Sequence, residues 1–276
     1  MYAETLRILK HSRPRFWLYL LGPVLVAGVA AQSSFYNYAW FWIFLLFTTV
    51  PANIFLYGVN DLFDRDTDKH NEKKTKKEAK AKYNDTGLIL SVIASGILSL
   101  ILFIFLPQKA MISFGLFIVL SIFYSAPPLR FKAKPFIDSF SNVLYILPGV
   151  ALYTTLTGTH PVPLAIISGW AWTAAMHLFS AIPDIEPDKK AGLRTTAIVL
   201  GQRESLLFCS FLWAVSVISS WPLLPTVFNA LSLLYPISAL VPLYTKEVTK
   251  QYWLYPYING LIGFALFLSI ALPSIV

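Results

Sequence analysis

The chain consists of long apolar runs separated by short polar breaks. A helix needs about 20 apolar residues to cross a bilayer, with a range of roughly 17–25. Nine runs are close to that length, and two neighbouring pairs are separated by little more than a turn, at Pro107 and at Pro222. Such short connections fit antiparallel neighbouring helices. The pattern predicts membrane-spanning helices over residues 16–31, 39–59, 88–106, 110–124, 136–155, 162–182, 206–221, 223–243 and 253–272.

The composition supports an all-α integral membrane protein. Hydrophobic residues make up 56% of the 276 positions, and charged residues only 13%. A soluble domain of this length has about 25% charged residues. The one cysteine, Cys209, lies in an apolar run, so a disulfide within the chain is excluded and a packing role is favoured.

The distribution of charge predicts the orientation. If the N-terminus is inside, every Lys and Arg except Lys109 falls in a cytoplasmic segment, and every Asp and Glu lies on the cytoplasmic side. Cytoplasmic loops of membrane proteins are enriched in Lys and Arg, so we expect the N-terminus inside and the C-terminus outside. Because the net charge of +8 is spread over membrane loops, we expect the bilayer and not nucleic acid as a partner. The ionisable groups, and therefore a site built from them, face the cytoplasm.

The stretch from Asn60 to Asp68 is the first candidate site. It follows a charge-free apolar run and contains four acids in eight positions. Like charges this close together raise one another's pKa unless a cation lies between them. Oxygen ligands at this density suit Mg²⁺, whose coordination is often completed by substrate phosphates. Asn60, Asp64 and Asp68 lie on one face of a continuing helix, with Asn53 and Tyr57 deeper on the same stripe.

A second acidic motif resembles the first and lies 120 residues further along the chain. Asp184 to Asp188 has the same order of acids, again after the second helix of a four-helix set. We therefore expect two parallel four-helix pseudo-repeats plus a ninth helix. Pro187 disfavours helix at Glu186, which predicts a bend that opens Asp184 and Asp188 onto the site. His177 and Ser180 share the face of Asp184, and His177 has either a packing role or a substrate contact.

Cations accompany both acidic motifs. Two prolines stiffen the segment from Tyr124 to Lys132 and place Arg130 and Lys132 near the same surface. Arginine binds diphosphate oxygens as a fork and lysine as a point charge. The alternative is that these cations only set the topology. The lysines of residues 73–82 are interpreted as a solvated loop that contacts anionic lipid.

Taken together, these motifs resemble the UbiA superfamily of intramembrane prenyltransferases. The likeness rests on Asn60-x-x-x-Asp64-x-x-x-Asp68, on Asp184-x-x-x-Asp188, and on the Tyr-Ser-x-Pro-Pro-x-Arg-x-Lys segment that begins at Tyr124. It covers essentially the whole chain, as one domain over residues 1–276. Within the superfamily, residues 179–188 with the following Ala191-Gly192 are most similar to lycopene elongases of C50 carotenoid synthesis.

The resemblance implies a fold and a reaction. Nine helices would surround a central cavity, and two Mg²⁺ ions held by the acidic motifs would bind an isoprenyl diphosphate. The prenyl group, expected to come from dimethylallyl diphosphate, would be transferred to an apolar acceptor that enters from the lipid, with lycopene as the first candidate. The site would face the cytoplasm of a prokaryotic cell. Quinone precursors and glycerol ether lipids are the alternative acceptors.

Each candidate residue then has an expected role. Catalysis is assigned to Asp64, Asp184 and Lys132. The expected metal ligands are Asn60, Asp64, Asp68, Asp184 and Asp188; the diphosphate-binding cations are Arg65, Arg130, Lys132, Lys190 and Arg194; and the substrate pocket contains Asn53, Tyr57, Tyr124, His177 and Ser180.

A cation-coupled transporter is the alternative from another class. Parallel repeats with acids at the inner mouth are compatible with it. Transporter sites, however, lie near the middle of the bilayer on interrupted helices, whereas these acids cluster at one predicted surface. The pattern therefore favours an enzyme.

Overall fold

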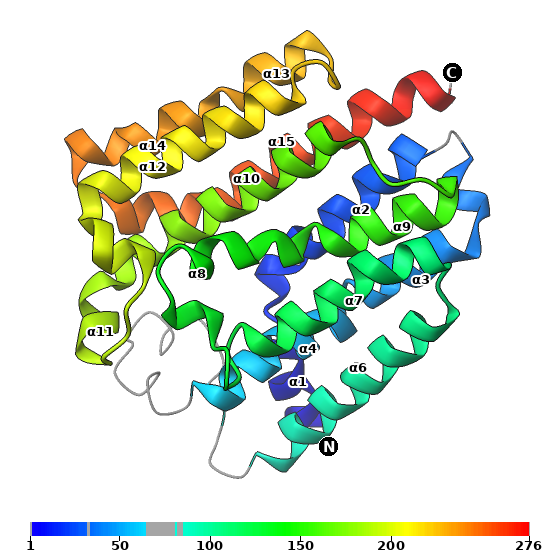
Figure 1. Cartoon of the computed structure of the whole chain (residues 1–276), viewed down its shortest axis with the longest axis horizontal. Coiled ribbons are helices and arrows are strands. Elements are labelled where there is room, and N and C mark those ends of the chain that lie inside the picture. Colours follow the sequence, from blue (N-terminus) through cyan, green and yellow to red (C-terminus); the bar gives the residue numbers. More distant parts are fainter. Residues whose placement is uncertain (1, 32–33, 65–80, 82–84, 276) are drawn as a thin grey trace. The chain divides into compact units, whose positions relative to one another are not determined.

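The computed structural model describes residues 2–31, 34–64, 81 and 85–275, and no β-strand occurs among them (Figure 1). The chain divides into two compact units. Unit 1 comprises Met1–Arg130 and Leu147–His160, and unit 2 comprises Phe131–Ile146 and Pro161–Val276. The single domain over residues 1–276 stays a prediction.

Seven stretches of the described residues are long and apolar enough to cross a membrane. They are Glu4–Ala31, Ala39–Phe63, Thr86–Phe105, Ile137–Thr157, Pro163–Lys190, Thr196–Ser220 and Thr226–Thr245, and Gln108–Phe123 is a shorter apolar helix. The all-helical membrane class is thereby confirmed. The count of nine spans, the orientation and the ring around a central cavity stay predictions.

Unit 1 contains most of the N-terminal half. Its helices are α1 (Tyr2–His11), η1 (Pro14–Phe16), α2 (Trp17–Ala31), η2 (Phe35–Asn37), α3 (Ala39–Phe47), α4 (Val50–Phe63), α6 (Thr86–Phe105), α7 (Gln108–Phe123) and α9 (Leu147–Thr157). α9 packs on both α2 and α7, and α4 packs on α6. At the α2–α9 crossing a Cβ on Gly149 would lie 2.6 Å from the carbonyl oxygen of Pro23. Only glycine permits this close approach of two helix backbones.

The apolar run 39–59 does not form the single helix that its pattern predicts. α3 ends at Phe47 and α4 begins at Val50, so the chain is interrupted at Thr48 and Thr49. The amide Nδ2 of Asn53 donates to the Thr48 carbonyl at 2.8 Å and to the Thr49 carbonyl at 2.5 Å. Carbonyls exposed by a helix break inside a membrane need internal donors, and Asn53 provides them.

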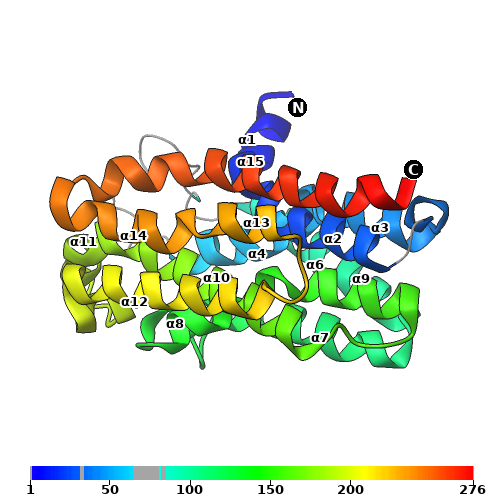
Figure 2. The ribbon, with the colours of Figure 1, turned by 90° about the horizontal axis from the view of Figure 1, so that it is seen from above.

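Unit 2 contains most of the C-terminal half. Its elements are η4 (Phe131–Ala133), α8 (Ile137–Phe140), η5 (Ser141–Tyr145), α10 (Pro163–Ala181), η6 (Ile182–Asp184), α11 (Ile185–Lys190), α12 (Thr196–Ser220), α13 (Thr226–Ser232), α14 (Leu234–Thr245) and α15 (Val248–Ile275). α12 packs on α10 and α14. Figure 2 shows α14 between α12 and α15.

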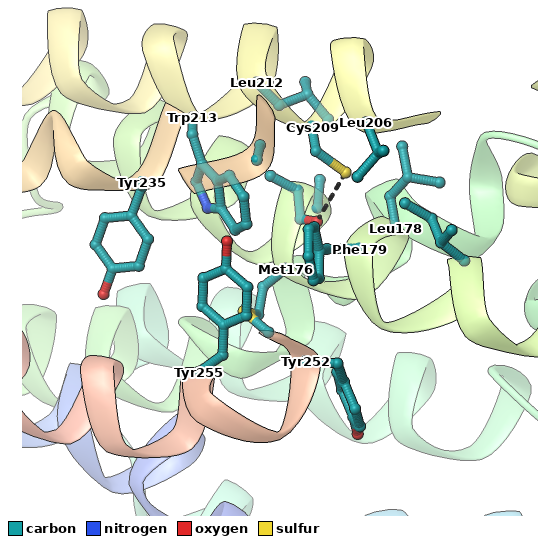
Figure 3. Close-up of a cluster of buried hydrophobic side chains, with 14 of the residues drawn as sticks. Met176, Leu178, Phe179, Leu206, Cys209, Leu212, Trp213, Tyr235, Tyr252 and Tyr255 are labelled. Carbon is teal, nitrogen blue, oxygen red and sulfur yellow. Dashed lines mark hydrogen bonds between the residues drawn. The ribbon is translucent and has the colours of Figure 1, made fainter. Parts of the chain in front are cut away.

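Aromatic side chains form the core of unit 2. Phe179, Trp213 and Tyr255 are fully buried and in mutual ring contact, with ring centroids 4.8–5.9 Å apart (Figure 3). The Cys209 thiol is buried beside them and donates to the Ala175 carbonyl at 3.4 Å. These contacts agree with the packing role predicted for Cys209.

Three further runs differ from their predicted helices. The run 136–155 is divided into α8, η5 and α9. The run 206–221 forms a helix that begins ten residues earlier, at Thr196, and is interrupted at Gly201, where φ is 75° and ψ is 172°. The run 223–243 is divided into α13 and α14. Hydropathy reports that a segment is apolar, but it does not report where the backbone leaves helical geometry inside that segment.

Candidate functional site

In unit 1, the first half of the first acidic motif contacts the proline-containing segment that follows α7. The Asn60 amide Nδ2 donates to the Ser125 hydroxyl at 2.9 Å. Nη2 of Arg130 lies 3.9 Å from Oδ1 of Asp64, whose side chain is buried. The structure therefore brings together three residues that the sequence assigned to one site: Asn60, Asp64 and Arg130. Tyr124, also predicted there, is half-buried next to Ser125.

The predicted stripe of oxygen ligands is only partly described. α4 ends at Phe63, and Asp64 is its C-cap residue, with its backbone N–H bound to the Asn60 carbonyl at 3.0 Å. Asn60 and Asp64 are therefore one helical turn apart, as expected, but Asp64 already has non-helical backbone angles. Arg65 and Asp68 lie outside the described residues, so their predicted roles remain predictions.

Asp61 has a different role from its neighbours, and sequence reasoning missed it. Its buried carboxylate contacts Nδ1 of His11 at 2.8 Å and accepts a hydrogen bond from Nη2 of Arg13 at 2.8 Å. The Arg13 guanidinium also lies over the Tyr57 ring, 4.6 Å from its centroid. Asp61 on α4 thus holds the end of α1 and the residues that follow it. The sequence showed Arg13 only as a topological charge, because nothing local pairs it with an acid 48 residues away.

The two deeper residues of the α4 stripe have contacts within the protein. The buried Tyr57 ring packs beside Phe16 and carries Arg13 on its face. Asn53 stabilises the α3–α4 break, and in the described part of the chain its buried Oδ1 has no hydrogen-bond partner. Both residues have a structural contribution, and their place in a substrate pocket stays a prediction.

In unit 2, the second acidic motif follows α10 through a short 3-10 turn. Asp184 ends η6, and Asp188 lies in α11; both side chains are partly exposed. Glu186 is helical, contrary to the effect predicted for Pro187. Pro187 falls in the first turn of α11, where the missing N–H has no helical partner to lose. The bend is therefore at residues 182–184. Glu186 is exposed, and its carboxylate lies 3.2 Å from Lys189.

A glycine ends the second motif. Gly192 has a φ of 71°, the Gly192 N–H binds the Lys189 carbonyl, and the Leu193 N–H binds the Asp188 carbonyl, both at 3.0 Å. This pair of bonds is the Schellman arrangement, which stops a helix sharply. Asp188 is therefore held in the last turns of a short helix with a defined end.

The other predicted residues of unit 2 differ in exposure. Lys132 is buried, whereas Lys190 and Arg194 are exposed. His177 is half-buried, and its Nδ1 lies 3.3 Å from the hydroxyl of Ser139. The Ser180 hydroxyl donates to the His177 carbonyl at 2.7 Å, which confirms that the two residues share a helix turn. Of these three predicted diphosphate-binding cations, Lys132 is the one that is buried.

The oxygen donors present suit a hard divalent ion. The first motif offers the buried Asp64 carboxylate and the Asn60 amide oxygen, whose amide nitrogen is directed to Ser125. The second offers Asp184 and Asp188. Within the described residues no three His, Cys, Asp or Glu side chains form a metal-binding group by themselves. Each of these two pairs of donors fits Mg²⁺, which binds through one or two carboxylates and is completed by water and phosphate oxygens.

Comparison with known proteins identifies the family. The model of the UbiA prenyltransferase family matches residues 20–246. The chain belongs to this family. It is 44% identical to the lycopene elongase/hydratase of Haloferax volcanii over 91% of this chain and 84% of that protein. It is 42% identical to the lycopene elongase/hydratase of Haloarcula japonica over 93% of this chain and 88% of that protein.

A solved structure shares the fold. The UbiA homolog from Archaeoglobus fulgidus, bound to DMAPP and Mg²⁺, matches with a TM-score of 0.72 at 22% identity, over 98% of this chain and 99% of that one. The resemblance read from the motifs is thus confirmed, and the chain is an integral membrane prenyltransferase of the UbiA type. Family membership also sets aside the transporter alternative.

Proposed function

We propose that this protein transfers a prenyl group from dimethylallyl diphosphate to lycopene. The observation that carries the proposal is the 44% and 42% identity, over at least 91% of the chain, to two proteins named lycopene elongase/hydratase. The DMAPP and Mg²⁺ bound by the Archaeoglobus homolog support the choice of donor and cofactor.

In this proposal the acidic motifs hold the diphosphate end of the donor through Mg²⁺. The ligands are Asn60, Asp64, Asp184 and Asp188, with Asp68 as a fifth. When bound, Mg²⁺ supplies positive charge to the leaving diphosphate oxygens. Asp64 and Asp184 are the catalytic members, one from each motif.

Protein cations bind the remaining diphosphate oxygens. The Arg130 guanidinium is 3.9 Å from the Asp64 carboxylate, so it can reach an oxygen bound beside that acid. Lys132 is buried, and a cation in a water-poor environment interacts more strongly with a developing anion. Lys190 and Arg194 are exposed and would close around the substrate from the end of α11 and from the segment before α12. Arg65 is a further candidate.

The reaction breaks the allylic C–O bond of the donor and forms a C–C bond to the acceptor. As the C–O bond breaks, the diphosphate keeps the electron pair and the prenyl carbon becomes cationic. Tyr124 is the aromatic candidate to shield this carbon, because the face of Tyr57 is already covered by Arg13. A terminal double bond of lycopene then attacks, which leaves a tertiary cation. Because the relatives are named elongase/hydratase, we favour capture of this tertiary cation by water, with release of a proton.

Location follows from the same proposal. The N-terminus is inside, the C-terminus is outside, and the acidic motifs face the cytoplasm of a prokaryotic cell. The apolar acceptor reaches the site from the bilayer. His177 and Ser180, on the last turns of α10, line the pocket next to the second motif.

Expression in a lycopene-accumulating host tests the proposal. Extracted pigments are separated by chromatography, and their masses are measured by mass spectrometry. We expect carotenoids heavier than lycopene by one or two prenyl groups, with or without added water, and none with an Asp184→Ala variant of equal expression. Unchanged lycopene with the wild-type protein, together with prenylated quinone precursors or glycerol ethers, would contradict lycopene as the acceptor.

A further inference from the structure

A buried hydrogen-bond cluster in unit 2 joins two segments that carry proposed diphosphate-binding cations. The Thr196 N–H donates to Oδ2 of Asp138 at 2.7 Å, and the Thr196 hydroxyl donates to Oδ1 of the same carboxylate. The Phe136 N–H donates to the Thr196 hydroxyl at 2.6 Å. We call these three residues, Asp138, Thr196 and Phe136, the Asp138–Thr196 clasp. It connects α8 and the residue before it to the first residue of α12.

The clasp holds backbone that would not adopt its shape alone. Phe136 has a φ of 66° and a ψ of −43°, an unfavourable conformation for a residue with a bulky side chain. Strained residues of this kind persist only where surrounding contacts determine the conformation, and they concentrate at functional sites. At the other end, Gly201 interrupts α12 one turn after Thr196. The first turn of α12 is therefore separated by this break from the rest of the helix, and the clasp is one of the contacts that hold it.

Stability alone does not account for a carboxylate at this place. Asp138 and Thr196 are both fully buried. In the described part of the chain, the carboxylate contacts only N–H and O–H donors, from Thr196 and from the Ser139 backbone, and no cation. A buried charge costs free energy even when it is hydrogen-bonded, and apolar replacements are often as stable. The geometry that the carboxylate fixes is the better explanation for its presence.

We propose that Asp138 and Thr196 are positioning residues for Lys132. The inference rests on the proposed function, in which Lys132 binds the diphosphate. Only one turn separates Lys132 from the clasp: the Lys134 N–H binds the Phe131 carbonyl at 3.0 Å, and the Lys134 carbonyl accepts from the Asp138 N–H at 2.9 Å.

The buried Lys132 side chain is thus carried on a segment whose other end is fixed to α12. The residue after Asp138, Ser139, contacts His177 through its hydroxyl. One buried cluster therefore sets the location of the Lys132 segment relative to α10 and α12, the helices next to the second acidic motif.

Removal of the Thr196 hydroxyl tests the proposal. The probe is dimethylallyl S-thiolodiphosphate, an analogue that resists cleavage, titrated with Mg²⁺ into purified protein in detergent. We expect Thr196→Val to weaken binding about tenfold, because a small displacement of a positioned group has effects of that order. Thr196→Ser, which keeps the hydroxyl, should restore binding to within about twofold. Thr173→Val is the matched control, since among the described residues its hydroxyl binds only a carbonyl of its own helix α10.

A Lys132→Ala background separates positioning from general structure. If the clasp acts through Lys132, Thr196→Val has no further effect on binding in that background, because coupled residues are not additive. A clasp that only stabilises the fold would weaken binding equally in both backgrounds, and that result would overturn the proposal. Wild-type affinity in Thr196→Val would also overturn it. Asp138→Asn provides the same test if Thr196→Val is not recovered folded.

The binding assay distinguishes failure of the proposed function from failure of the positioning role. If the wild-type protein does not bind the analogue, the proposed function is wrong. If the wild-type protein binds it and Thr196→Val binds equally well, only the positioning role of the clasp is wrong.

Discussion

Replacement of Asp61 by Asn should destabilise unit 1, because this buried carboxylate holds two basic side chains. Its oxygens contact His11 and Arg13, each at 2.8 Å, and the side chains of Asp61 and His11 are 2% and 0% exposed. An amide retains one acceptor oxygen and presents N–H groups in place of the other. The amide oxygen can still accept from Arg13, but the negative charge that pairs with the guanidinium is lost, and an N–H group faces His11 where a carboxylate oxygen was.

The size of the effect follows from burial. Breaking a buried ion pair by removing one partner costs about 3–5 kcal/mol. Because Asn keeps one hydrogen bond, we expect the lower end, about 3 kcal/mol. For a chain of this size, that corresponds to a fall in the unfolding temperature of roughly 6–12 °C.

Glu204→Gln is the matched control. Its carboxylate also contacts an arginine, Arg203, at 2.9 Å, but the two side chains are 52% and 77% exposed. Exposed pairs of this kind contribute about 0–1 kcal/mol. Thermal unfolding in detergent, followed by intrinsic tryptophan fluorescence, measures both variants. Equal unfolding temperatures for Asp61→Asn and Glu204→Gln would refute the reasoning.

Two further predictions concern packing and substrate binding. Gly149→Ala should lower the unfolding temperature, because its Cβ would lie 2.6 Å from the Pro23 carbonyl oxygen. Gly22→Ala, whose Cβ would meet no atom within 4 Å, is the control and should leave the unfolding temperature unchanged. Similar unfolding temperatures for the two variants would contradict the α2–α9 contact. Arg130→Ala should raise the KM for dimethylallyl diphosphate about tenfold or more, because a charge-assisted contact is lost. Arg203→Ala, which removes an exposed cation, is the control in initial-rate assays, and equal KM values would exclude Arg130 from the site.

Local patterns in the sequence were sufficient for the membrane class and for parts of the site. Helical spacing placed Asn60 and Asp64 one turn apart, and His177 beside Ser180, as the structure has them. The proline-containing segment also brought Arg130 to Asp64, as expected. These features depend on residues close together in sequence, or on the strong topological rule that charged loops share one face.

Helix interruptions and distant pairs were beyond local reasoning. The break at Thr48 and Thr49 falls inside a uniformly apolar run, which an average over many residues does not resolve. The contacts of Asp61 with Arg13 and of Asp138 with Thr196 join positions 48 and 58 residues apart. Such contacts arise from tertiary packing and leave no periodic signal along the chain.

The most direct measurement is the release of inorganic pyrophosphate from dimethylallyl diphosphate by purified protein in the presence of lycopene. We predict release by the wild-type protein with Mg²⁺, none after chelation by EDTA, and recovery when Mg²⁺ is restored. Asp64→Ala and Asp184→Ala should each abolish release, because each removes a proposed Mg²⁺ ligand from a different acidic motif. Full release by both variants, or by the wild-type protein without a divalent ion, would contradict the account.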